Sequence, residues 1–121
     1  MNESILKTKS FKFAVRIVNL YKHLCDNKRE FVLSKQILRS GTSVGANIRE
    51  AEHSEGKADF VHKMAISQKE INETIYWLEL LQATEYISKQ EFESINAYAV
   101  EIIKMLTSSI KTAKSKLTTN R

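Results

Sequence analysis

The scarcity of residues that break helices constrains this chain more than any other feature of its sequence. It has no proline and only three glycines among 121 residues, so few positions force a helix to stop. With 42% hydrophobic residues, a chain of this length can bury one core without disulfides or metals. The sequence therefore predicts a single all-α domain spanning residues 1–121.

Apolar periodicity and stop signals predict four helices. The first has an apolar surface wider than one core requires, because Phe11 and Val15 lie beside its main stripe. Ser34 is the expected N-cap of the second helix, and Ser88 and Glu91 form a capping box before the fourth. Short connections between such helices predict an up-down-up-down antiparallel four-helix bundle. The expected helices cover residues 3–26, 34–54, 58–83 and 89–117.

Two glycines, Gly41 and Gly45, interrupt the middle of the second expected helix. Each costs about 1 kcal/mol relative to alanine in a helix interior, so packing has to offset that cost. They lie one turn apart, and we expect a groove there in which another backbone approaches closely. Short polar side chains on a second face indicate a polar seam between helices or subunits, or else tolerated surface residues. The expected packing and oligomer residues are Gly41, Ser43, Gly45, Asn47 and Glu50.

Two segments carry a family resemblance: QILRSGTSVGANIREA at residues 36–51 and KADFVHKMAISQKEINETIYWLELL at residues 57–81. They resemble the bacterial four-helix-bundle family encoded in intervening sequences of large-subunit ribosomal RNA genes, which is ribosomal-protein-like. This chain departs from the family at Arg49, where many members have a small residue, and at Ala51, where they have glycine. The matching positions are Gln36, Arg39, Ser43, Asn47, Ile48, Glu50, Phe60, Ile66, Glu73, Leu78 and Glu79.

The resemblance implies a homopentamer of four-helix bundles. The family is similar to the accessory variability determinants of diversity-generating retroelements, which bind nucleic acid and a reverse transcriptase. The resemblance therefore implies fold and assembly more directly than it implies a biochemical role.

Metal chemistry has to be considered because Glu-x-x-His is the ligand motif of di-iron four-helix bundles. Glu50 and His53 have this spacing, and Asp59 and His62 match it loosely. Both pairs flank the expected turn between the second and third helices, at the end of the bundle and not in its core. The other two helices have no glutamates at the same level along the bundle that could bridge two metal ions. His23 would lie roughly 25 Å or more away at 1.5 Å per helical residue. We predict no metal site and no cofactor.

Catalytic motifs are also lacking in the sequence. It has no glycine-rich phosphate loop and no serine or cysteine nucleophile beside a suitable base. The single Cys25 has no partner for an internal disulfide and is expected to be a small apolar packing residue. We predict that the protein is not an enzyme.

Charge is distributed unevenly along the chain. Residues 1–39 carry nine basic and three acidic side chains, residues 40–103 carry five and eleven, and residues 104–121 carry five and none. The expected topology brings both basic ends of the chain together. Clustered lysines and arginines bind phosphate through counterion release, and Phe11 and Phe13 are candidates for stacking on unpaired bases. The expected nucleic-acid-binding residues are Lys7, Lys9, Lys12, Arg16, Lys111, Lys114, Lys116 and Arg121.

These observations favour a non-enzymatic homo-oligomer that binds nucleic acid, with structured RNA as the expected ligand. The alternative is a protein–protein interaction scaffold whose acidic middle or apolar helix surface docks a partner protein, with no direct nucleic-acid contact. A simpler interpretation of the basic residues alone is a solvated face, with both phenylalanines in the core. No apolar run approaches the ~20 residues of a membrane span, and the first twelve residues lack a signal-peptide core. A cytoplasmic protein without a membrane partner is expected.

Overall fold

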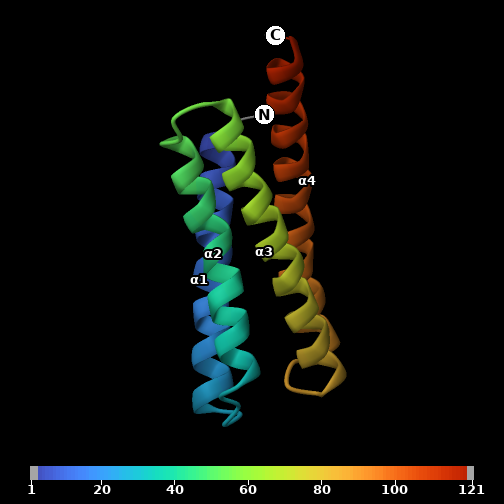
Figure 1. Ribbon diagram of the computed structural model, residues 1–121. Helices are drawn as coiled ribbons and strands as arrows, with labels where there is room; N and C mark the ends of the chain where they lie inside the picture. Colours follow the sequence, from blue (N-terminus) through green and yellow to red (C-terminus); the bar gives the residue numbers. More distant parts are fainter. Residues whose placement is uncertain (1–2, 120–121) are drawn as a thin grey trace.

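The computed structural model describes residues 3–119, which form four α-helices and no strand. Consecutive helices run in opposite directions, so that α1 begins at the end of the bundle where α4 finishes (Figure 1). Each helix packs against the next one in the chain, and α1 meets α4 more sparsely. The predicted all-α, four-helix architecture is confirmed. The helices are α1 (Glu3–Asp26), α2 (Leu33–Glu52), α3 (Lys57–Ala83) and α4 (Lys89–Thr119).

One apolar stripe from each helix forms the core. Phe13 is fully buried, whereas Phe11, two residues earlier on α1, is 59% exposed. None of the helices within residues 3–119 has an apolar stretch long enough to cross a membrane. The largest fully buried side chains are Phe13, Leu6, Ile17, Leu24, Ile37, Ile48, Met64, Ile71, Leu78, Leu81, Ile102 and Leu106.

The start of α2 differs from the expectation, because Ser34 is not its N-cap. Ser34 lies inside the helix and is fully buried, and its hydroxyl donates to the carbonyl oxygen of Glu30 at 2.9 Å. The carboxylate of Glu30 caps the helix instead. It accepts hydrogen bonds from the backbone N–H groups of Val32, Leu33 and Ser34 at 3.2, 3.0 and 2.7 Å. One upstream side chain thus satisfies three donors of the first turn.

The other helix ends are fixed by local hydrogen bonds. The backbone N–H groups of His53 and Ser54 turn back to α2, which ends two residues earlier than expected. At the start of α4, the backbone N–H of Ser88 donates to the Glu91 carboxylate at 2.9 Å, and the N–H of Glu91 donates to the Ser88 hydroxyl at 3.0 Å. The predicted capping box is confirmed.

Gly41 and Gly45 lie where α2 meets α1. A Cβ atom added to Gly41 would lie 2.7 Å from Cγ2 of Ile17, and one added to Gly45 would lie 3.4 Å from the carbonyl oxygen of Ser10. The neighbouring backbone at Gly45 is therefore that of α1 in the same chain. The absence of side chains here allows α1 and α2 to pack closely.

Candidate nucleic-acid interface

Two of the expected basic residues on α1 are bound to α4. The Nζ atom of Lys9 lies 2.6 Å from Oε1 of Glu101 and 5.7 Å from the ring centre of Tyr98. The hydrogen bond to Glu101 is the main reason that the pKa of Lys9 is raised. Arg16 donates to the hydroxyl and the carbonyl oxygen of Ser94 at 3.1 and 3.4 Å. Lys9 and Arg16 thus link α1 and α4, which pack together more sparsely than the other neighbouring helices.

Basic side chains gather around Phe11 on the outer face of α1. A surface cavity of about 390 Å³ is lined by Phe11, Lys7, Lys12 and Arg49, together with Thr8. Lys12 and Arg49 are exposed, and the Nζ atom of Lys7 lies 3.4 Å from the carboxylate of Glu52. We call Lys7, Phe11, Lys12 and Arg49 the Phe11 cluster. It combines three cations with an aromatic ring that is more than half exposed.

The sequence-based prediction did not include Arg49 among the binding residues. Arg49 is a basic residue in the acidic middle of the chain, so a count of charge along the sequence does not select it. The packing of α2 against α1 brings it beside Lys7, Lys12 and Phe11.

The last turns of α4 form a second basic surface. α4 continues past the turn between α2 and α3 (Figure 1), and Lys111, Lys114 and Lys116 on it are exposed. Arg121 lies outside the described residues. Ser94, the partner of Arg16, precedes Lys111 by about 25 Å along α4 at 1.5 Å per residue. The structure therefore divides the expected basic residues into the Phe11 cluster, the end of α4, and the two links to α4.

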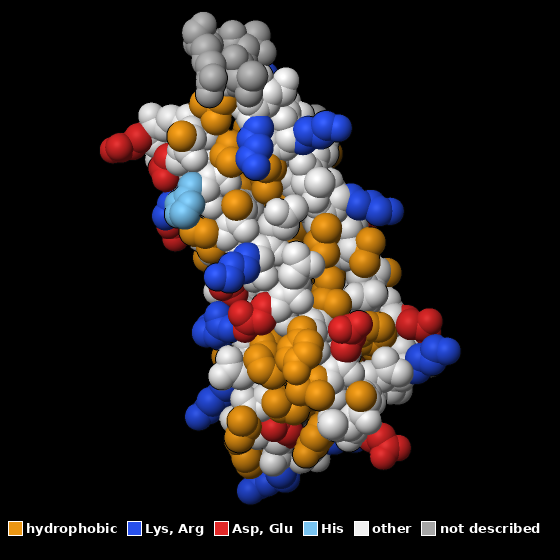
Figure 2. Space-filling model, turned by 45° about the vertical axis from the view of Figure 1, so that its right-hand side comes forward, with side chains coloured by type: hydrophobic (Ala, Val, Ile, Leu, Met, Phe, Trp, Pro, Cys, Tyr) orange, Lys and Arg blue, Asp and Glu red, His pale blue; other side chains and the backbone are white. Residues whose placement is uncertain are grey.

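Figure 2 shows how charged and hydrophobic side chains are distributed over one face of the molecule. On the face drawn in Figure 2, lysine and arginine side chains are spread along the molecule and are interspersed with acidic and hydrophobic ones. A hydrophobic patch bordered by acidic side chains lies in the lower half of that view. This face does not carry one continuous basic area.

The polar face of α2 is used mainly within the chain. The Ser43 hydroxyl and the Asn47 amide donate to carbonyl oxygens of their own helix at 2.7 and 2.8 Å. Ser40 is fully buried, and its hydroxyl accepts a hydrogen bond from Thr74 of α3 at 2.9 Å. The buried part of this face is thus a seam between α2 and α3.

Glu50 and the histidines do not form a metal centre in the described structure. The carboxylate of Glu50 pairs with Lys63 at 3.0 Å, and this hydrogen bond raises the pKa of Lys63. His53 and His62 are exposed. Within residues 3–119, no three His, Cys, Asp or Glu side chains are close enough together to hold a metal ion.

The fold and these surfaces define a small helical bundle that carries basic side chains at the end where its first helix begins and its last helix finishes. The chain belongs to the 23S rRNA-intervening sequence protein family, whose family model matches residues 2–108. The family resemblance seen in the sequence is therefore confirmed.

A solved structure supports the same assignment. This chain is similar to a protein with unknown function from the S23 ribosomal protein family of Bacteroides thetaiotaomicron, whose crystal structure is known. The two sequences are 60% identical. The match covers 92% of this chain and 99% of that one, with a TM-score of 0.91. No protein with a curated description matches this chain.

Proposed function

We propose that the protein is a non-enzymatic, cytoplasmic, homo-oligomeric bundle that binds structured RNA. The observation that carries the proposal is the Phe11 cluster, in which an aromatic ring 59% exposed to solvent lies beside Lys7, Lys12 and Arg49. An exposed phenylalanine among cations fits a nucleic acid, because its ring stacks on unpaired bases while the cations bind phosphates.

The end of α4 would extend this interface. Lys111, Lys114 and Lys116 lie within a segment, residues 104–121, that has five basic and no acidic residues. Contacts of this kind bind the phosphate backbone without reading base sequence. The association of the family with 23S rRNA intervening sequences supports RNA as the ligand.

Assembly into a homopentamer would strengthen such binding. Val32 and Tyr76 are 71% and 56% exposed, which leaves apolar surface for contacts between copies. The glycines of α2 do not supply that surface, because α1 of the same chain occupies it. A weak RNA contact repeated on every subunit of one rigid assembly gains from effective concentration.

The experiment compares RNA affinity among charge variants of the full chain. Lys12→Gln with Arg49→Gln tests the Phe11 cluster, and Lys111→Gln with Lys114→Gln tests the end of α4. Fluorescence anisotropy with a structured RNA should show that both double variants bind more weakly than the unmodified protein. The slope of log affinity against log salt should become shallower by up to about 0.7 to 0.9 per lost phosphate contact.

Lys22→Gln with Lys35→Gln is the matched control, because both lysines are exposed near the opposite end of the bundle. It removes the same charge and should leave the slope unchanged. Equal losses from all three double variants would mean that only net charge matters. Intact protein without detectable RNA binding at low salt would favour the alternative, a scaffold that docks a partner through its apolar, acid-bordered surface.

A further inference from the structure

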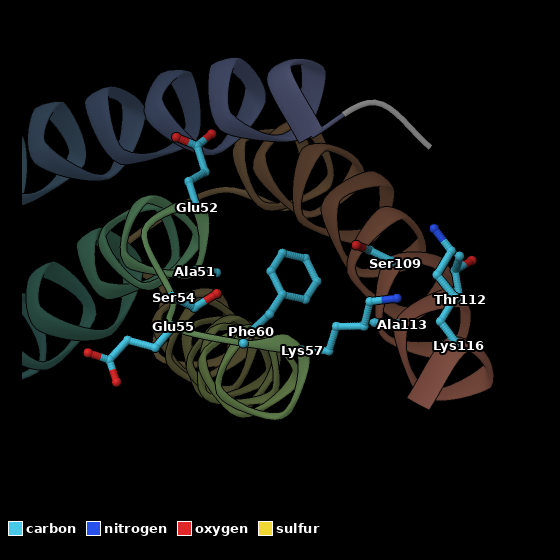
Figure 3. Close-up of a pocket in the computed structure, with 11 residues that line it drawn as sticks. Ala51, Glu52, Ser54, Glu55, Lys57, Phe60, Ser109, Thr112, Ala113 and Lys116 are labelled. Carbon is cyan, nitrogen blue, oxygen red and sulfur yellow. The ribbon is translucent and has the colours of Figure 1, made fainter. Parts of the chain in front are cut away.

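A cavity of about 510 Å³ opens at the end of the bundle, where α2 turns into α3 and α4 passes by (Figure 3). Its volume falls in the range of about 300 to 1,000 Å³ typical of small-molecule sites. Its wall combines charged, hydroxyl and apolar groups from three helices. The lining residues that matter below are Glu52, Lys57, Phe60, Ser109, Ala113 and Lys116.

Ser109 supplies a polar group that lacks a partner. Its side chain is only 7% exposed, and its hydroxyl makes no hydrogen bond within the part of the chain that the structure describes. Figure 3 shows this hydroxyl directed into the cavity, on the side of the Phe60 ring. The buried side-chain atoms without a partner in the described part of the chain do not include this oxygen, so it keeps contact with the cavity. It can therefore donate to, or accept from, a ligand there.

Positive charge converges on the same cavity. Lys57 and Lys116 line it, and Lys57 reaches from α3 toward α4 (Figure 3). The cavity also borders the first turn of α3, whose N-cap residue, Gly56, has no side chain to cap it. The free backbone N–H groups and the dipole of a 27-residue helix favour an anion at this end.

The acidic residues near the cavity do not cancel this charge. Glu52 is paired with Lys7 at 3.4 Å. The Glu55 carboxylate points away from the cavity in Figure 3. Asp59, in the first turn of α3, accepts the backbone N–H of Glu55 at 3.4 Å and does not line the cavity.

We infer that this cavity binds one nucleotide, with its phosphate at Lys57, Lys116 and the Ser109 hydroxyl and its base against the Phe60 ring. Figure 3 places that ring at the centre of the cavity, and stacking on it does not require a particular base. The nucleotide has two sources, a free mononucleotide or an unpaired nucleotide within RNA. Only the second source rests on the proposed function.

Calorimetric titration of the full chain with AMP, adenosine and inorganic phosphate tests this assignment. AMP should bind more tightly than either part alone. Lys57→Gln should weaken AMP binding at least about tenfold, since a hydrogen bond to a charged group is lost. Ser109→Ala should weaken it less, and Phe60→Leu should weaken both AMP and adenosine by about 5- to 150-fold through lost stacking.

Lys104→Gln is the control, because Lys104 is exposed on α4 and does not line the cavity. It should bind AMP as the unmodified protein does. Ser109→Ala removes one oxygen atom and keeps the assignment testable if Phe60→Leu perturbs folding. No AMP binding at millimolar concentration, or equal binding by the Lys57, Ser109 and control variants, would overturn the assignment.

A competition experiment separates the two sources. If AMP displaces a short single-stranded RNA and Lys57→Gln weakens that RNA, the cavity takes a nucleotide of the RNA. If AMP binds without affecting RNA, the ligand is a free mononucleotide. RNA binding without AMP binding would remove this inference and leave the proposed function standing. AMP binding without RNA binding would support this inference and contradict the proposed RNA-binding function.

Discussion

Single residues without side chains set the distance between α1 and α2. The backbone at Gly41 faces Ile17, and a Cβ there would lie 2.7 and 2.8 Å from two carbons of that side chain. Ile17 is fully buried and branched at Cβ, so it has little freedom to move aside. Close packing of this pair offsets the intrinsic cost of glycine in a helix.

Gly41→Ala should therefore destabilise the protein, although alanine is the better helix former. Overpacking of this kind costs about 1 to 3 kcal/mol, which thermal unfolding would record as a lower Tm. Gly56→Ala makes the same change where nothing lies within 4 Å of an added Cβ, so it involves no overpacking. Gly56 is the N-cap of α3, and its replacement should cost no more than about 1 kcal/mol. An unchanged or raised Tm for Gly41→Ala would contradict the packing described for Ile17.

The start of α2 shows how an element can depend on a residue outside it. Arg29 adopts a positive φ of 56°, and the backbone N–H of the next residue, Glu30, donates to the carbonyl oxygen of Leu24. This turn directs the Glu30 carboxylate back toward the first turn of α2. Burial raises the pKa of Glu30, but hydrogen bonds from Leu33, Ser34 and Val32 outweigh it and leave the pKa below its ordinary value.

Glu30→Ala should lower the free energy of unfolding at neutral pH by about 1 to 2 kcal/mol, the typical cost of losing a helix cap. Because the folded-state pKa is lowered, this stabilisation is present above the ordinary carboxyl range of about 4 to 5. It is lost as pH falls through the folded-state pKa. Urea titrations at several pH values should show the two proteins converging in acid.

Glu93→Ala, at an exposed position on α4, is the control for this change and should have a much smaller effect. If the free energies of unfolding of the unmodified protein and Glu30→Ala differed by the same amount from neutral to acidic pH, the capping role of the Glu30 carboxylate would be contradicted.

Local signals predicted all four helices and the cap of α4, but they missed the cap of α2 for a physical reason. The Ser88 and Glu91 capping box was predictable because a serine followed three residues later by a glutamate is a known sequence pattern for a helix start. The cap at Glu30 was not, since it depends on the turn that precedes it. The basic residues show a related limit of prediction from sequence. The positive charge of Lys9 made it a candidate for binding phosphate, but its ion pair with Glu101 joins residues far apart in the sequence and could not be predicted locally.

At the scale of the whole molecule, one chain leaves apolar side chains in contact with water. Val32, Phe11 and Tyr76 are all more than half exposed. The four helices bury a continuous core without them. Contacts between copies would cover part of this surface, which is the physical basis for the proposed assembly.

A homopentamer of this 13.9-kDa chain should have a mass of about 70 kDa, which light scattering behind a sizing column can measure. Val32→Lys with Tyr76→Lys should shift that mass downward without loss of helicity, because both side chains are exposed and lie outside the core. A constant mass near 14 kDa for the unmodified chain across a wide concentration range would exclude any stable oligomer.

The central claim is that the protein binds RNA through its cations, and the salt dependence of that binding tests it most directly. Affinity of the unmodified chain for a structured RNA should fall linearly with salt on a double-logarithmic plot, with a slope of about −0.7 to −0.9 per phosphate contact. The Lys12→Gln, Arg49→Gln variant should give a shallower line. A slope near zero, or no binding at low salt, would contradict RNA binding through these basic side chains.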